Sequence, residues 1–420
     1  MDLFDKLKSG NSPLGKYAGL GDGYFMFPKL EGEISSRMKF RGKEKIVWSL
    51  NNYLGLANHP EVRKADAEAS ANYGLGLPMG SRMMSGNSDQ HEKLEQDLAD
   101  FVGKEAGYLQ NFGYQGMVSA IDCLVNRHDV IVYDAESHAC IIDGVRLHQG
   151  KRFVFAHNDI DNLEKQLKRA MDIVQTTRGG ILVISEGVFG MAGDQGKLKE
   201  IAALKEKYPF RFMVDDAHGF GTLGETGAGA GEAQDCMDAI DVYFSTFAKS
   251  FSSIGAFFAA SRAVIDHLRF NSRSQIFAKS LPMPLVIGNQ KRFDLLKSKP
   301  ELREKLWHNV NMLQNGLRER GYNIGNTSSC VTPVYLSSGE VTEAAGLIID
   351  LRETYNIFCS AVIYPVVPKG VLLLRLIPTA VHTEEDINLT LDAFDQVSGK
   401  LKRGDYRSVE PQKLVQQIHG

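Results

Sequence analysis

Between residues 46 and 260, short apolar runs alternate with amphipathic stretches. Runs such as DVIVYD at 129–134 and GILVISEG at 180–187 have the length of buried strands, whereas DQHEKLEQDLADFVG at 89–103 has apolar residues at helical spacing. Strands that alternate with helices build βαβ units around a parallel sheet, so this stretch predicts one large α/β layer. The other expected strands are 105–111, 152–157, 210–216, 241–246 and 255–260, and a second helix is expected at 159–174.

After about residue 262 the pattern changes to longer helices, and an amphipathic helix at 302–321 precedes a smaller α+β unit. We therefore expect an N-terminal arm at 1–45 that packs on another domain or subunit, a large domain at 46–295 and a small C-terminal domain at 296–420. The elements expected in the small domain are strands near 331–336, 357–364 and 371–377 and helices at 341–354 and 384–402.

Charge and cysteine content exclude several classes of protein. The chain has 48 Lys+Arg against 51 Asp+Glu, so its net charge of −3 gives no general attraction for nucleic acid. Its five cysteines form no CxxC motif, so neither a metal site nor a disulfide framework is indicated. No signal peptide and no membrane-spanning apolar run is recognisable. We expect a cytoplasmic protein without a metal, a membrane segment or a nucleic-acid partner.

Polar side chains follow three of the predicted strands. The run FRFMV is followed by Asp215 and then by His218, and DVIVYD is followed by His138. The run DVYFS leads through Thr246 to Lys249. Ligands of open α/β sheets bind beyond the carboxyl ends of the strands. If these strands are parallel neighbours, a carboxylate, two histidines and a lysine converge at one edge of the sheet.

This set of groups fits pyridoxal 5'-phosphate (PLP). PLP enzymes need a lysine for a Schiff base, an acid that faces the pyridine nitrogen and donors for the phosphate. Each residue alone is a weak signal, because acids after strands usually cap helices and single histidines are usually structural. The spacing of the glycines argues against a nucleotide-binding site. Residues 74–80 read GxGxxxG rather than the dinucleotide-binding GxGxxG, and no GxxxxGK[ST] motif occurs. The combination therefore predicts a PLP site.

Longer motifs carry a family resemblance from about Gly23 to Leu401. The motifs are NNYLGLANHP at 51–60, GSRMMSGN with HEKLE at 80–95, DAESHACIIDGVRL at 134–147, GVFGMAGD at 187–194, VDDAHGFGTLGETGAG at 214–229, TFAKS at 246–250 and YPVVPKGVLLLRLIPTAVHT at 364–383. In this order they resemble the α-oxoamine synthases, which are PLP-dependent transferases of fold type I. The resemblance implies a large domain with a mainly parallel sheet flanked by helices and a smaller α+β C-terminal domain.

The resemblance also implies the catalytic residues. Lys249 would hold PLP as a Schiff base and then transfer a proton, and Asp215 would pair with the pyridine nitrogen. His218 would reach the phenolic oxygen of the cofactor, and His138 would stack on the face of its ring.

Further residues are implied to bind the phosphate and the substrate. The phosphate would be bound by the backbone of Gly113 and Tyr114, by the hydroxyl of Thr246 and by Ser280 of the partner subunit in a homodimer with shared active sites. The substrate carboxylate would be bound by Arg375 with the help of Asn51.

Two positions depart from the family pattern. Gly190 stands where the family has serine, and FAKSL at 277–281 replaces F-[ST]-x-S-L, so that Ala278 and Lys279 replace a hydroxyl and add a cation. We expect Gly190 and Ala278 to open space and Lys279 to serve an additional anion, which favours a long-chain acyl donor.

The resemblance implies a PLP-dependent acyltransferase that condenses a small amino acid with an acyl thioester of CoA or acyl carrier protein, with loss of CO₂, to give an α-aminoketone. Segment 267–284 favours synthesis of long-chain bases, of the serine palmitoyltransferase or cysteate acyltransferase type. Glycine C-acetyltransferase and oxononanoate synthase activities remain alternatives. A fold-type-I aminotransferase is a further alternative, although the histidine at 138 opposes it, because transaminases usually stack an aromatic ring there.

Overall fold

The computed structural model of this protein describes residues 2–5, 7, 15 and 23–407. It divides into two compact units. The large unit comprises residues 51–190 and 194–305, and the small unit comprises the described residues up to 50, residues 191–193 and residues 306–407. The predicted domain divisions, after residues 45 and 295, stay a prediction.

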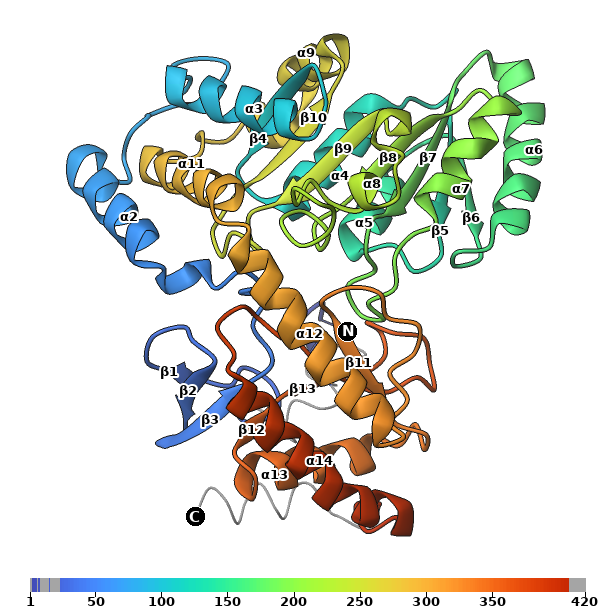
Figure 1. Cartoon of the computed structure of the whole chain (residues 1–420). Helices are drawn as coiled ribbons and strands as arrows, with labels where there is room; N and C mark the ends of the chain where they lie inside the picture. The colour runs from blue at the N-terminus through green and yellow to red at the C-terminus, as the bar shows by residue number, and fades with distance from the viewer. Residues whose placement is uncertain (1, 6, 8–14, 16–22, 408–420) are drawn as a thin grey trace. The chain divides into compact units, whose positions relative to one another are not determined.

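The large unit contains a seven-stranded sheet with the order β4-β10-β9-β8-β7-β5-β6 (Figure 1). β10 is antiparallel to both of its neighbours, and all other pairs are parallel, which confirms the predicted mainly parallel sheet. The strands are β4 (Ala106–Gln110), β5 (Val130–Asp134), β6 (Lys151–Phe155), β7 (Ile181–Glu186), β8 (Arg211–Asp215), β9 (Val242–Thr246) and β10 (Ala256–Ala260).

Most strands of this sheet are apolar along their length because helices cover the sheet. Side chains from α4, α5 and α9 join those of the strands in one buried cluster. Parallel pairing places the carboxyl ends of β5, β7, β8 and β9 at one edge, with β7 between the two strands that end in Asp134 and Asp215. The helices are α2 (Pro60–Tyr73), α3 (Asp89–Phe101), α4 (Gly113–Leu124), α5 (Ala139–Leu147), α6 (Ile160–Thr177), α7 (Leu198–Ala203), α8 (Ala230–Ala233), α9 (Arg262–Asn271), α10 (Arg273–Ile276) and α11 (Met283–Ser298).

The small unit has two sheets and three long helices. The three-stranded antiparallel sheet is formed by β11 (Thr332–Tyr335), β14 (Leu373–Leu376) and β13 (Ser360–Val362), in agreement with the predicted strands. The second sheet has the order β1-β2-β3-β12, in which β12 (Ile357–Phe358) pairs with β3. Its three N-terminal strands were not predicted: β1 (Leu30–Glu31), β2 (Arg37–Phe40) and β3 (Lys43–Val47). The helices are α12 (Glu301–Glu319), which starts in the large unit, α13 (Val341–Glu353) and α14 (Glu384–Arg403). Among the helices of the described residues, none is long and apolar enough to span a membrane.

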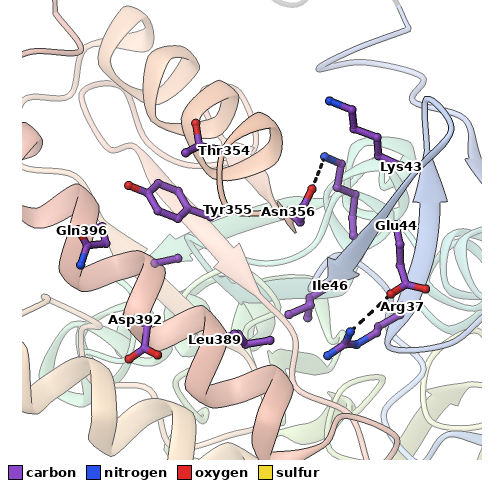
Figure 2. A pocket seen from close by; sticks show the side chains of 12 residues that line it. Arg37, Lys43, Glu44, Ile46, Thr354, Tyr355, Asn356, Leu389, Asp392 and Gln396 are labelled. Carbon is purple, nitrogen blue, oxygen red and sulfur yellow. Dashed lines mark hydrogen bonds and ion pairs between the residues drawn. The ribbon is translucent and has the colours of Figure 1, made fainter.

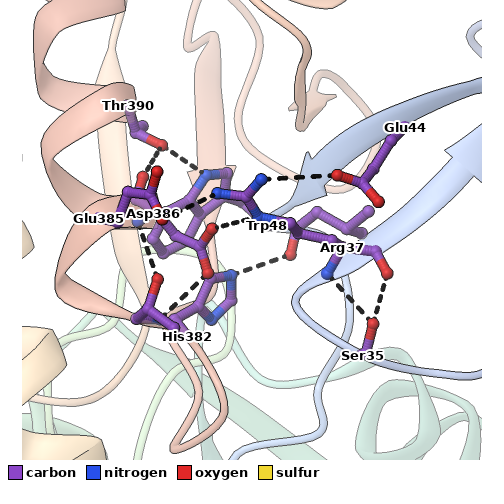
Figure 3. Close-up of polar contacts among 10 residues, drawn as sticks. Ser35, Arg37, Glu44, Trp48, His382, Glu385, Asp386 and Thr390 are labelled. Atoms are coloured by element: carbon purple, nitrogen blue, oxygen red, sulfur yellow. Dashed lines mark hydrogen bonds and ion pairs between the residues drawn. The ribbon is translucent and has the colours of Figure 1, made fainter.

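Polar contacts join the N-terminal strands to α14 (Figure 3). Arg37 donates from Nε to Asp386 Oδ1 at 2.7 Å. The indole N–H of Trp48 donates to Thr390 Oγ1 at 3.0 Å, and its ring stacks on His382 with the centroids 4.0 Å apart. Because these partners are more than 300 residues apart in sequence, no local pattern could predict the contacts.

A pocket of about 710 Å³ opens in the small unit beside β3 and α14 (Figure 2). Lys43, Tyr355 and Asp392 are among its lining residues, and Lys45 donates to Asn356 Oδ1 at 3.0 Å. None of the predicted site residues lines this pocket. The predicted chemistry therefore has to be located at the sheet edge of the large unit.

Candidate active site

Asp215 is the last residue of β8, and its side chain is buried. Its Oδ1 accepts a hydrogen bond from the Ala217 N–H at 3.1 Å, and the thiol of Cys140 lies 3.9 Å from Oδ2. Burial raises the pKa of Asp215, and the charges of Lys249 and His138 act in the opposite direction. A buried carboxylate with weak neutral donors is an acceptor suited to a cationic ligand.

Lys249 lies in the turn between β9 and β10 and is half-buried. The Ser252 N–H donates to the Lys249 carbonyl at 2.9 Å, which closes the turn. The ammonium acts electrostatically on both Asp215 and His138. The lysine, the carboxylate and this histidine therefore come together at one sheet edge, as predicted from the polar residues that follow the parallel strands.

His138 caps the N-terminus of α5, where its Nδ1 accepts the Cys140 N–H at 3.3 Å. Its own backbone N–H donates to the carboxylate of Glu186, the last residue of β7. Although His138 has exposed surface, desolvation by the surrounding protein atoms lowers its pKa, and the charge of Asp215 acts in the opposite direction. Sequence reasoning missed Glu186 and Cys140, although Glu186 ends an apolar strand in the same way as Asp215.

His218 is buried, and its Nδ1 lies 2.7 Å from the hydroxyl of Tyr53. The same hydroxyl donates to Asn51 Oδ1 at 3.4 Å. An ideal Cβ placed on Gly190 would lie only 2.2 Å from His218 Nε2. The expectation that Gly190 opens space is therefore wrong, because the imidazole of His218 fills that space. Tyr53 was not predicted, although it lies within the NNYLG motif.

The predicted phosphate-binding residues lie together. α4 begins at Gly113, and an ideal Cβ there would be 3.2 Å from Thr246 Oγ1, so the helix start touches the end of β9. The hydroxyl of Thr246 donates to the Gly255 carbonyl at 3.0 Å. The ring of Tyr114 lies edge-on to His138, with the centroids 6.2 Å apart. The first N–H groups of a helix have no intrahelical partner, so this is a place where an anion can bind.

Ser280 is buried, its N–H donates to the Gly80 carbonyl at 2.9 Å, and its hydroxyl has no hydrogen-bond partner among the described residues. Lys279 is exposed, and its ammonium donates to the Leu75 carbonyl at 2.8 Å. The side-chain amide of Asn111 donates to the Lys279 carbonyl at 2.5 Å. This segment therefore lies beside the residues that lead into α4.

Arg375 lies on β14 in the small unit, opposite Pro333 and Ser360, and is half-buried. Asn51 belongs to the large unit. Their joint role in binding a substrate carboxylate stays a prediction.

The residues of the sheet edge fit PLP. The buried carboxylate of Asp215 matches a protonated pyridine nitrogen, and the start of α4 beside Thr246 suits a phosphate dianion. Within the described residues, no group of three or more His, Cys, Asp or Glu could hold a metal ion.

Comparison with known proteins agrees with this fit. The family described as aminotransferase class I and II matches residues 43–394. The cysteate-C-fatty acyltransferase of Capnocytophaga ochracea is 61% identical over 408 residues, 97% of each chain. The 8-amino-7-oxononanoate synthase of Thermoanaerobacter pseudethanolicus is 36% identical over 89% of this chain and 92% of that one. A solved structure of SPT (serine palmitoyltransferase) with the PLP internal aldimine has a TM-score of 0.86 and 30% identity, covering 96% of this chain and 100% of the other.

The chain belongs to the aminotransferase class I and II family and, within it, to the α-oxoamine synthases. Its cofactor is PLP, and its fold is fold type I. The reaction is the condensation of an amino acid with an acyl thioester. Acyl transfer is thereby favoured over the aminotransferase alternative.

We predict that Asp215→Asn retains the fold and binds PLP but loses most of its turnover, because a neutral amide cannot keep the pyridine nitrogen protonated. The lost charge-assisted hydrogen bond corresponds to about 1.5–3 kcal/mol of cofactor binding, and kcat should fall further. Titration of the apoenzyme with PLP and steady-state kinetics measure both effects. Asp235→Asn, at a fully exposed carboxylate, is the matched control. A near-normal kcat of Asp215→Asn would contradict the role of Asp215.

Proposed function

We propose that this enzyme condenses cysteate with a long-chain fatty acyl thioester. The observation that carries the proposal is the 61% identity, over 97% of both chains, to a cysteate-C-fatty acyltransferase. The motif in segment 267–284 favours the same long-chain class. The acyl donor is a thioester of CoA or of acyl carrier protein, and the reaction takes place in the cytoplasm.

In the proposed reaction, PLP supplies an electron sink for negative charge at the substrate Cα. Lys249 would hold the cofactor covalently and, when free, would remove the proton from Cα. Asp215 would pair with the pyridine nitrogen and keep it protonated. The ring of His138 would pack against the cofactor face, and His218, held by the hydroxyl of Tyr53, would hydrogen-bond the phenolic oxygen.

Bond changes at the substrate follow from this arrangement. The Cα carbon forms a bond to the thioester carbonyl, the C–S bond breaks, and the thiolate leaves and takes up a proton from solvent. The bond from Cα to the carboxylate then breaks to release CO₂, and Lys249 returns a proton to Cα. The guanidinium of Arg375, helped by Asn51, binds the carboxylate and orients Cα for proton removal.

Phosphate binding and the subunit arrangement belong to the same proposal. The backbone of Gly113 and Tyr114 and the hydroxyl of Thr246 bind the cofactor phosphate, and Ser280 is contributed by the second subunit of a homodimer. Large apolar side chains exposed in the large unit support a second copy of this chain as their cover, because soluble monomers seldom expose such groups together. They are Leu75 (68% exposed), Met79 (72%), Met84 (81%) and Phe277 (77%).

We predict that cysteate binds the holoenzyme at a lower concentration than serine, glycine, alanine or threonine. Titrations that follow the cofactor absorbance measure half-saturation for each amino acid. Taurine is the matched control, since it has the sulfonate of cysteate without the carboxylate, and it should bind weakly if Arg375 recognises the carboxylate. Half-saturation by serine or glycine at a lower concentration than cysteate would contradict the substrate assignment.

We predict that two inactive chains regenerate activity when mixed. One chain carries Lys249→Ala, and the other carries both Lys279→Ala and Ser280→Ala. Subunit exchange should give heterodimers with one intact site if residues 279 and 280 act across the interface. The rate of the mixture is compared with the rates of the two parents after the same exchange treatment. A mixture no more active than its parents, or an active monomer in sedimentation, would contradict shared sites.

A further inference from the structure

His157 follows β6, and its imidazole bridges two carboxylates in the large unit. Its Nδ1 lies 2.9 Å from Asp134 Oδ1, and its Nε2 lies 2.8 Å from Asp194 Oδ2. A ring nitrogen that faces a carboxylate oxygen at this distance carries a hydrogen. Because both ring nitrogens face carboxylates, the geometry favours the imidazolium form, which donates a hydrogen bond to each of them.

The charges around His157 agree with this form. Glu136 adds a third carboxylate, whose Oε2 lies 3.9 Å from Nε2 of His157. The ring of Phe189 packs edge-on against the imidazole, with the two ring centroids 4.4 Å apart. Burial lowers the pKa of His157, but hydrogen bonds and charge pairing with Asp134 and Asp194 outweigh burial and raise this pKa to about 10. The stabilisation is therefore present in full below the unfolded-state pKa of about 6.5 and is lost as the pH rises through about 10.

One end of the bridge lies under the turn that carries His138. Asp134 is fully buried at the end of β5, and it accepts hydrogen bonds from the N–H groups of Glu136 at 2.8 Å and Asn158 at 3.0 Å. The Ser137 N–H donates to the Asp134 carbonyl at 3.2 Å. The orientation of Asp134 therefore sets the start of the turn that ends at His138.

The other end of the bridge lies at the loop that carries Gly190. Asp194 accepts a second hydrogen bond from the side chain of Asn158 at 2.9 Å, and its carbonyl accepts the Phe189 N–H at 2.9 Å. Gly190, which directly follows Phe189, is in contact with the ring of His218. A displacement of this loop therefore alters the space in which His218 is held.

We propose that His157 is a positioning residue of the active site, whose imidazolium joins Asp134 to Asp194 and thereby fixes both the turn that carries His138 and the loop that packs against His218. The inference rests on the proposed roles of these two histidines at the cofactor. His157 acts through the two carboxylates.

The test compares His157→Gln and His157→Asn with the wild type. Each amide can reach one of the two carboxylates but supplies no charge and cannot bridge both. We expect PLP to bind the apoenzyme about tenfold more weakly and kcat to fall by at least about tenfold, as for a lost charge-assisted hydrogen bond. KM for the amino acid should change less, because Arg375 and Asn51 are untouched. His308→Gln is the control, because His308 makes an exposed carboxylate pair with Glu384 at 2.9 Å.

A second measurement does not depend on activity or on the folding of a variant. Imidazole ¹⁵N chemical shifts of the wild-type apoenzyme should show His157 protonated at pH 8. A neutral His157 at pH 8 would overturn the proposal. So would PLP affinity and kcat within about twofold of wild type in both His157 variants. Failure of cysteate as a substrate would overturn the proposed function instead and would leave the PLP and chemical-shift results to decide on His157.

Discussion

A buried carboxylate at the end of β8 is the constraint on which the rest of the active site depends. Asp215 is out of contact with bulk solvent, and its charge is stabilised only if cationic groups lie close to it. Lys249 is such a group, since its charge lowers the pKa of Asp215. Parallel pairing of β8 with β7 and β9 places the lysine turn and the Glu186 end at the same edge, so the sheet topology itself assembles the charged site.

The neighbouring acid, Asp216, accepts hydrogen bonds from groups within the protein. It is fully buried, and its Oδ2 accepts hydrogen bonds from the Ala230 N–H at 2.8 Å and the Tyr243 hydroxyl at 2.9 Å. An ideal Cβ on Gly187 or Gly229 would lie within 2 Å of its carboxylate, and Gly229 also has a φ of 109°. Gly187 and Gly229 therefore let two loops close around the side chain of Asp216, which fixes the backbone next to Asp215.

Structural elements that depend on a local sequence pattern could be predicted. The strands of the large unit are short apolar runs that need burial on both faces, and the polar residues after them identified Lys249, Asp215 and His138. The pairing of β3 with β12 was missed because the two strands are more than 300 residues apart and the pairing has no local signal. The hairpin of β2 and β3 does have a local signal, the two-residue turn at Arg41 and Gly42, which was overlooked. Tyr53 and His157 act through tertiary partners, and the error at Gly190 arose because the position of His218 could not be read from its motif.

The substrate assignment is tested most directly by the product. Purified enzyme is incubated with palmitoyl-CoA and with cysteate that carries ¹³C in its carboxyl group. The products are then separated, and their masses are measured by mass spectrometry. We expect a long-chain aminoketone that retains the sulfonate, together with labelled CO₂ and free CoA in equal amounts. A product formed only when serine or glycine replaces cysteate, or one that retains the labelled carbon, would contradict the substrate assignment.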